Sequence, residues 1–328
     1  HIQALWRWRQ PTICLSCGIR KDDPHCLLQK TLCLQQPGLE ELFDAFFDAA
    51  VQAGYQLTTD VNGYRQEGFA PFDRNVYRGR RLSAARAYLS PVLNRPNLEV
   101  RTRAHTTRLL VEGKKVVGVE TVERRSFGRQ LGHHRYKAQT VVCCAGAINT
   151  PQLLQLSGIG PQSVLAHAEV PVLVDLPGVG ENLQDHLEFY FQFRCQKPVS
   201  LNGKLDWWNK LKIGVRWILR KDGLGATNHF ESCGFIRSKA GVEWPDLQYH
   251  FLPAAMRYDG REAFDGDGFQ LHIGHNKPKS RGFVHVLSAD PKQAPRIRFN
   301  YLEHEADREG FRDCVRLTRE IISQPAMD

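Results

Sequence analysis

The fold is decided by the stretch VVCCAGAINTPQLLQLSGIG, residues 141–160. Its apolar start predicts a short buried strand over 141–143. Ala145 and Gly146 follow, and neither has the bulk to keep another molecule away from the backbone. We therefore expect a strand that leads into a crossing made of small residues.

A helix is expected directly after this crossing. Asn149 or Thr150 can cap it, with Pro151 as its first residue, because proline lacks the N–H that a first turn leaves unpaired. Gly158 is expected to end it in the left-handed conformation. A strand, small residues and a helix N-terminus together offer a place for a phosphate-bearing cofactor, although an ordinary strand–turn–helix connection has the same pattern.

The segment from Gly146 to Gly160 resembles the second signature of the glucose–methanol–choline (GMC) family of FAD-dependent oxidoreductases. The resemblance extends from about Leu39 to the C-terminus and is strongest to members that oxidise choline. Three further segments carry it: Asp60–Phe69, Ser83–Leu89 and Pro177–His186.

The resemblance implies an α/β (α+β) fold with FAD as cofactor. Residues 36–185 would be a partial FAD-binding domain, and 186–328 an antiparallel-sheet substrate-binding domain. Thr106 stands where the main chain of family members meets the adenine end of the flavin, although valine is more usual there. The implied cofactor-binding residues are Thr106, Ala145, Gly146, Asn149, Thr150 and Pro151.

Periodicity predicts the remaining elements. Helices are expected over 39–51, 83–89, 164–169, 207–220 and 305–323. Strands are expected over 97–102, 107–111, 116–122, 170–174, 189–193, 235–236, 247–251, 269–273 and 282–287. We expect a loop from Asp60 to Tyr77 and an exposed hairpin tip from Arg124 to Lys137.

Glu231 is the candidate for binding a substrate cation, because the sequence places it among aromatic residues. With Tyr249 and Phe251 it forms the predicted substrate-binding set. A carboxylate surrounded by aromatic faces suits a quaternary ammonium, since that group donates no conventional hydrogen bond. The alternative is a surface glutamate on an edge strand.

Composition limits the other functions. The 44 basic and 35 acidic residues give a net charge of +9, which favours anionic surfaces and peripheral association with a membrane. No nucleic-acid partner is expected, because the basic residues show no aromatic interleaving and no recognition-helix pattern. The nine cysteines indicate a reducing compartment.

Residues 1–35 differ from the rest and are expected to be an atypical, disordered or non-native leader. Cys14 and Cys17 begin a zinc-like pattern that His25, Cys26 and Cys33 do not complete. No metal site is therefore predicted. The family carries its dinucleotide-binding unit where this leader stands.

No catalytic residue is assigned. Three histidines, His186, His229 and His250, do not match the family's catalytic motif, which we expect beyond Asp328. No complete Gly-rich phosphate loop is present either. This polypeptide alone is therefore expected to bind FAD weakly or not at all and not to oxidise choline.

Three functions stay open: a piece of an enzyme that oxidises choline to betaine aldehyde, a GMC enzyme for another primary alcohol, and a non-catalytic truncated chain. The electron acceptor is unknown. The resemblance implies the mitochondrial inner membrane or matrix for a eukaryotic source, and a cytoplasmic, membrane-associated location for a bacterial one.

Overall fold

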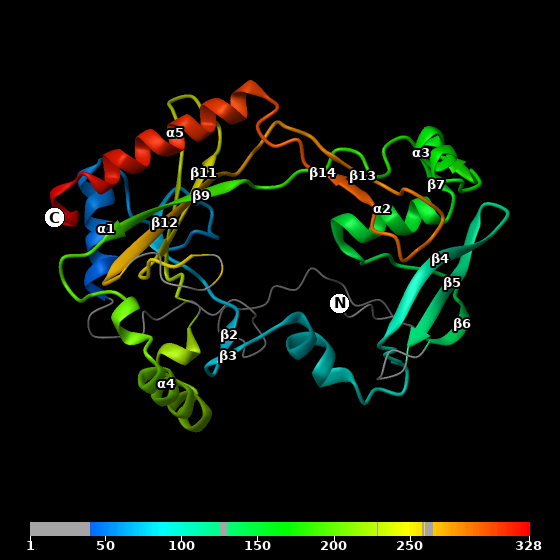
Figure 1. Ribbon diagram of the computed structural model, residues 1–328, viewed down its shortest axis with the longest axis horizontal. Coiled ribbons are helices and arrows are strands. Elements are labelled where there is room, and N and C mark those ends of the chain that lie inside the picture. The colour runs from blue at the N-terminus through cyan, green and yellow to red at the C-terminus, as the bar shows by residue number, and fades with distance from the viewer. Residues whose placement is uncertain (1–39, 125–129, 228, 258, 260–264) are drawn as a thin grey trace. The chain divides into compact units, whose positions relative to one another are not determined.

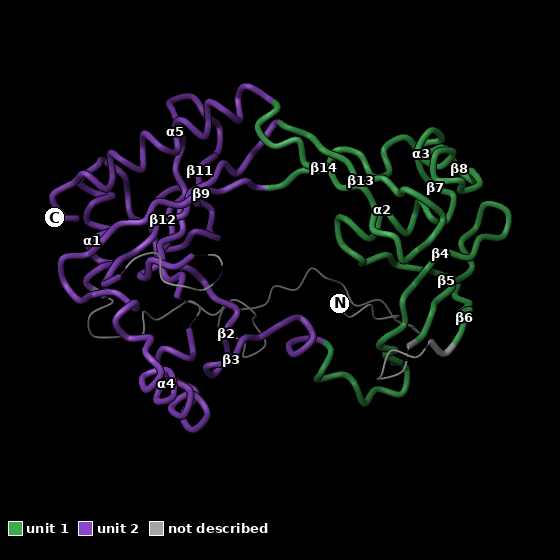
Figure 2. The backbone as a smooth tube through the Cα atoms, in the orientation of Figure 1, with its two compact units in different colours: residues 1–15, 89–185, 280–303 green, residues 16–88, 186–279, 304–328 purple. Residues whose placement is uncertain are grey.

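The computed structural model describes residues 40–328 except 125–129, 228, 258 and 260–264 (Figure 1). The expected leader and the cysteine pattern of residues 1–35 lie outside this range. The described chain forms two compact units (Figure 2). Unit 1 contains 89–185 and 280–303, and unit 2 contains 40–88, 186–279 and 304–328.

The units differ from the two consecutive ranges expected from the sequence. A unit boundary does lie between Asp185 and His186. However, 40–88 belong to the same unit as the large sheet, and 280–303 belong to the other unit. The assignment of 36–185 to FAD binding stays a prediction.

Unit 2 is built on a five-stranded antiparallel sheet with the strand order β1-β10-β11-β12-β9. Its strands are β1 (Gly68–Pro71), β10 (Ser232–Ile236), β11 (Leu247–Leu252), β12 (Gly268–His275) and β9 (Glu188–Arg194). The sequence predicted four of them. The fifth, β1, lies inside the expected loop 60–77, which is therefore wrong for these residues. It was missed because a four-residue edge strand has little period-two signal.

One face of this sheet forms the main hydrophobic core. Helices α1 (Glu40–Gln52) and α5 (Glu305–Ile322) pack against it (Figure 1). Phe46 of α1 is fully buried and stacks on Phe251 of β11 at 4.8 Å between ring centroids. Because strand side chains alternate between faces, this packing leaves every second residue of β11 and β12 for the opposite face.

The smaller elements of unit 2 connect these layers. They are β2 (Val76–Tyr77), β3 (Arg80–Arg81), the π-helical turn Ala85–Leu89, α4 (Trp207–Arg220) and 3₁₀ turns at Asn202–Lys204, Leu224–Ala226 and Pro325–Met327. Helix α4 matches its predicted range. Its N-cap is Asp206, whose Oδ1 accepts hydrogen bonds from the N–H groups of Trp208 and Asn209.

Unit 1 contains the three-stranded antiparallel sheet β4-β5-β6 and several shorter elements. They are β4 (Ala104–Glu112), β5 (Lys115–Arg124), β6 (Gln130–Lys137), α2 (Gly146–Leu156), β7 (Ile159–Gly160), α3 (Gln162–His167), β8 (Val174–Asp175), β13 (Phe283–His285), β14 (Arg296–Arg298) and the 3₁₀ turn Ser90–Val92.

Several strand predictions fail in unit 1. Residues 97–102 form no strand, and the third strand is β6, inside the expected hairpin tip. Only Val174 of the expected strand 170–174 is in a strand. Strand β13 pairs with β14 and does not join the large sheet. Periodicity identifies extended segments but does not identify their partners.

Helix α2 begins at Gly146, so Pro151 lies inside it and does not start it. Asn149 and Thr150 are consequently not its caps. The left-handed end at Gly158 is confirmed, with φ at +80°. The buried strand expected at 141–143 is wrong, since these residues pair with no described strand and Val142 is 77% exposed.

Gln155 fastens α2 to the rest of unit 1. Its fully buried amide donates to the carbonyls of Val179 and Val284 at 3.1 and 2.9 Å and accepts from the N–H of Val286 at 2.8 Å. Gly180 must be a glycine, because a Cβ there would lie 2.3 Å from this amide and φ is +87°. The glycine turn at 177–180 thus serves packing.

Replacing Gln155 with leucine should therefore destabilise unit 1. The change leaves three buried backbone groups unpaired, which should lower the local free energy of unfolding by about 3 kcal/mol. Hydrogen exchange of the peptide containing β13 measures it. The matched control is Gln152→Leu, because Gln152 makes one bond, 3.0 Å to Gln293 O, and should cost about 1 kcal/mol or less. Equal protection of the β13 peptide from hydrogen exchange in the two variants would contradict the role of Gln155 in holding α2 to the rest of unit 1.

Candidate active site

The second face of the large sheet carries a row of polar and aromatic side chains. Cys233, His250, His272 and Tyr190 are direct cross-strand neighbours on β10, β11, β12 and β9. Tyr190 lies against His272 with ring centroids 5.1 Å apart. Cross-strand neighbours on one face are close enough to form a continuous surface.

Two phenylalanines from the flanking loops complete this surface. Phe72 stacks on His250 at 5.1 Å, and Phe230 meets His250 and His272 edge-on at 6.2 and 5.6 Å. Phe72 is placed by its N–H, which donates to the carbonyl of Glu231 at 3.0 Å. We call Phe72, Tyr190, Phe230, His250 and His272 the aromatic face.

The hydrogen bonds of His272 define its tautomer. Gln270 Oε1 accepts from the N–H of Met256 at 2.9 Å and from Gln192 at 3.1 Å, so the Gln270 amide nitrogen must face His272. That nitrogen lies 2.6 Å from His272 Nε2, which therefore accepts. Nδ1 carries the proton and donates to Glu188 Oε1 at 3.0 Å. Glu188 thus orients the ring.

Glu231 lies directly before β10 and forms a buried ion pair. Its Oε1 is 2.7 Å from Arg74 Nη1, and both residues are 8% exposed. Within the part of the chain that the structure describes, Oε2 makes no hydrogen bond. The carboxylate is therefore held in place by Arg74 and keeps one oxygen for a ligand.

Two histidines beside this pair are held neutral. Burial lowers the pKa of His229, with Glu231 opposing the shift and Arg74 adding to it. Burial also lowers the pKa of His250, with Glu188 opposing it and His272 adding to it. A neutral imidazole presents an aromatic surface without competing for the carboxylate.

The structure brings only part of the predicted substrate-binding set together. Glu231 lies next to Phe230 and the aromatic face. Tyr249 and Phe251 do not join it: both are fully buried on the core side of the sheet, and Tyr249 Oη accepts a hydrogen bond from Thr318 Oγ1 at 3.3 Å. Period-two alternation could have shown this, because His250 stands between them.

Sequence reasoning also missed several residues of the site. Arg74 is 157 positions from Glu231, and no local pattern connects the two. His272 and Tyr190 lie on strands that were predicted, and Glu188 directly precedes the range predicted for its strand, but their arrangement depends on strand order. Strand order was not available from the sequence.

The predicted cofactor-binding residues lie in unit 1. Thr106 is in β4, three residues before Leu109, whose N–H donates to Ser157 Oγ at the end of α2 at 2.8 Å. Strand and helix are therefore fixed to each other. Ala145 precedes α2 and gives it no side-chain cap, while Asn149, Thr150 and Pro151 are half-buried inside it.

The start of α2 fits part of a dinucleotide cofactor. Gly146 has φ at +84°, and no heavy atom lies within 4 Å of the position a Cβ would take. An open, uncapped helix start leaves N–H groups that can meet a phosphate. These residues can hold one portion of FAD, and the aromatic face belongs to the other unit.

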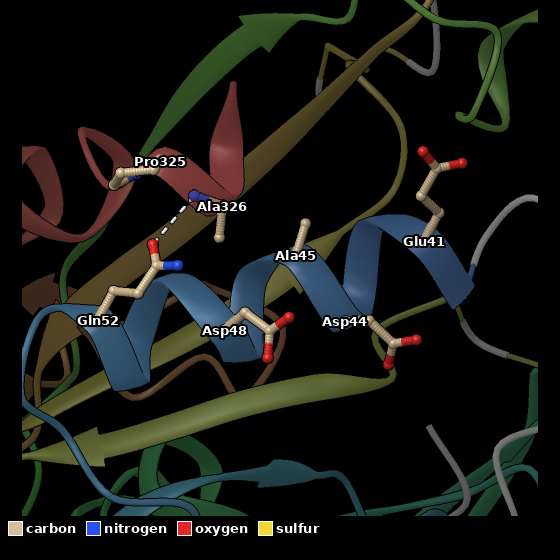
Figure 3. A pocket seen from close by; sticks show the side chains of 7 residues that line it. All are labelled: Glu41, Asp44, Ala45, Asp48, Gln52, Pro325 and Ala326. Atoms are coloured by element: carbon tan, nitrogen blue, oxygen red, sulfur yellow. Dashed lines mark hydrogen bonds between the residues drawn. The ribbon is translucent and has the colours of Figure 1, made fainter.

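A hollow elsewhere on unit 2 does not join this site. It lies on the outer side of α1 beside Pro325 and Ala326, with Glu41, Asp44 and Asp48 along the helix (Figure 3). Gln52 Oε1 closes one end by accepting from the N–H of Ala326 at 3.0 Å. Among the described residues there is no metal-ligand cluster, and no helix there is long and apolar enough to cross a membrane.

Comparison with known proteins gives consistent matches. The two sequence models described as GMC oxidoreductase match residues 29–188 and 278–328. Oxygen-dependent choline dehydrogenase of Photobacterium profundum is 56% identical over 290 residues, covering 88% of this chain and 50% of that protein. The Escherichia coli proteins of the same name are 51% identical over 294 residues, covering 89% and 52%.

Solved structures show the same fold. Pyridoxine 4-oxidase from Mesorbium loti superimposes with a TM-score of 0.74 at 28% identity, covering 89% of this chain and 52% of that one. Aspergillus oryzae formate oxidase gives 0.80 at 22% identity, covering 89% and 54%. The chain thus spans about half the length of the relatives it matches.

The Arg74–Glu231 pair should be strongly coupled. Arg74→Met or Glu231→Gln alone leaves one buried group without its partner and should each lower the stability of unit 2 by about 3–5 kcal/mol. The double variant should recover most of the loss. Urea unfolding followed by tryptophan fluorescence measures this, because Trp207, Trp208, Trp217 and Trp244 are all in unit 2. If the loss of stability in the double variant equalled the sum of the two single losses, a direct interaction between Arg74 and Glu231 would be excluded.

Unit 2 should lose stability as the pH falls through about 6.5, which is the pKa of histidine in an unfolded chain. There the unfolded chain takes up protons at His229 and His250, whereas the folded protein, with both pKa values lowered, does not. His250→Phe should reduce the slope by up to about 1.4 kcal/mol per pH unit. His186→Phe, at an exposed position, is the control and should not change it. An unchanged slope in His250→Phe would exclude its uptake of a proton on unfolding.

Proposed function

This chain belongs to the GMC oxidoreductase family, and from that premise we propose that it forms the substrate-binding wall and part of the flavin site of an FAD-dependent enzyme that oxidises a primary alcohol. Choline, giving betaine aldehyde, is the proposed substrate. The observation that carries the proposal is the aromatic face with Glu231 beside it. Bound FAD would supply the hydride acceptor.

The aromatic face suits a trimethylammonium group for electrostatic reasons. The negative faces of aromatic rings attract a cation that no hydrogen bond can hold, with about 0.5–2 kcal/mol for each ring. Phe72 and Phe230 are fixed by stacking and edge contacts to His250, so they lose little freedom on binding. The neutral state of His250 matters here, because an imidazolium would repel the substrate.

Glu231 adds a directed charge to this surface. Arg74 Nη1 holds Oε1 of the buried carboxylate at 2.7 Å, and Oε2 has no hydrogen-bonding partner among the described residues. A ligand cation near Oε2 would therefore meet a carboxylate that is already oriented. Preorganisation of this kind reduces the free-energy cost of binding.

Arg74 also favours the second candidate, a GMC enzyme for an uncharged primary alcohol. Its guanidinium balances the charge of Glu231, so the net field at the pair is weaker than that of a lone carboxylate. In that case the pair would position loop 72–74 against β10, and the aromatic face would bind an apolar alcohol. The two candidates predict different responses to the charge of the substrate.

Glu231→Gln should discriminate against the cation. In the full-length protein with FAD bound, the KM for choline should rise by about 5–150-fold, which corresponds to about 1–3 kcal/mol for a charged hydrogen-bond partner. The KM for 3,3-dimethylbutan-1-ol, which has the same shape without the charge, should change little. Dye reduction by the substrate measures both.

Glu243→Gln is the matched control, because Glu243 is exposed on the same unit. It should leave both KM values unchanged. An equal rise for choline and for the neutral alcohol in Glu231→Gln would exclude the cation site and favour the second candidate.

A further inference from the structure

Helix α4 exposes an apolar surface that the proposed activity does not use. Six of its large apolar residues are exposed to solvent: Trp207 66%, Trp208 64%, Leu211 48%, Val215 46%, Ile218 62% and Leu219 76%. At 100° per residue they occupy one third of the helix circumference. No residue of this helix is buried, and it projects from the edge of unit 2 (Figure 1).

The opposite side of α4 holds the helix firmly on unit 2. Trp217 Nε1 donates to the carbonyl of Gly79 at 2.7 Å. Gly79 cannot carry a side chain, because a Cβ there would lie 1.6 Å from the carbonyl oxygen of Lys221. Ile213 and Trp217 pack on Gly225. The exposed side is therefore presented by a fixed helix and does not result from loose packing.

Basic residues border the exposed apolar side. Lys210 lies on one edge and Lys212 on the other, with Arg216 and Arg220 further round the helix. No acidic residue occurs between Asp206 and Asp222. Asp222 pairs with Arg216 at 2.7 Å and leaves the two lysines exposed. A polar edge of Lys and Arg around Trp, Leu and Ile is the pattern of a helix that lies in a membrane interface.

We propose that α4 docks the protein on an anionic lipid membrane, with the helix parallel to the surface. Trp207 and Trp208 would enter the headgroup region, where their amphipathic rings are favoured. Lys210 and Lys212 would meet the lipid phosphates. Its 14 residues are too few to span a bilayer, which needs about 20.

Charge complementarity favours lipid over a second copy of the chain. Two copies meeting through this side would bring their lysine edges together, and like charges repel in such an interface. An anionic lipid surface supplies the missing negative charge along the whole helix, attracting each lysine separately. Repulsion from Lys210 and Lys212 likewise disfavours any basic segment of the protein itself as the partner that covers this surface.

Sedimentation with vesicles tests this on the full-length protein. We expect binding to vesicles of phosphatidylcholine mixed with phosphatidylglycerol, weaker binding to phosphatidylcholine alone, and release at high salt. Trp208→Ser with Leu219→Ser should reduce partitioning by about tenfold or more. Lys210→Gln with Lys212→Gln should reduce it by about 25-fold on the anionic vesicles only, about fivefold for each lysine.

Trp244→Ser is the matched control, because Trp244 is 58% exposed in unit 2 and has Lys277 5.6 Å from its ring. It should bind as the unchanged protein does. All variants should keep their far-UV circular dichroism, since the altered side chains are exposed. The proposal would be overturned if binding were equal on anionic and neutral vesicles, or if the α4 substitutions left binding unchanged.

Two rival occupants give distinct results, and either would overturn it. Concentration-dependent dimerisation that Trp208→Ser with Leu219→Ser abolishes, without vesicle binding, would assign the surface to a second copy. Vesicle binding by residues 1–328 but not by the full-length protein would assign it to another segment of that protein.

Discussion

The alternation of side chains in the five-stranded sheet is the constraint on which unit 2 depends. Tyr249 and Phe251 are fully buried in the core that α1 and α5 form with the sheet, so their side chains share one face of β11. His250, the residue between them, then has to face the opposite side. His272 is paired with His250 across the sheet and Tyr190 with His272, so both side chains face the same side as His250. The aromatic face is thus a consequence of how the core is packed.

Local features of the sequence predicted most elements but not their partners. Helix α4 has a clear cap at Asp206 and a clear period, and its range was predicted correctly. Strand β1 and the pairing of β13 with β14 depend on distant residues, so periodicity could not identify them. Pro151 shows the limit of a local rule: its preference for a first turn yields to a helix that begins at Gly146.

The candidate site was predicted for its chemistry and missed for its geometry. Phe230, the neighbour of Glu231 in the sequence, does lie on the aromatic face, whereas Tyr249 and Phe251 lie on the core side of the sheet. Arg74 could not have been found, because a buried ion pair between distant loops leaves no local pattern. Its presence changes the interpretation of Glu231 from a lone charge to an oriented carboxylate with one engaged oxygen.

In the proposed function the aromatic face, and not the core side of β11, receives the substrate. A crystal structure of the full-length protein with FAD and tetramethylammonium tests it most directly. We expect the cation against Phe72 and Phe230, with Glu231 Oε2 as the nearest carboxylate oxygen and Arg74 still paired to Oε1. A cation bound away from this surface, or Glu231 released from Arg74 and turned away from it, would show that the aromatic face does not receive the substrate.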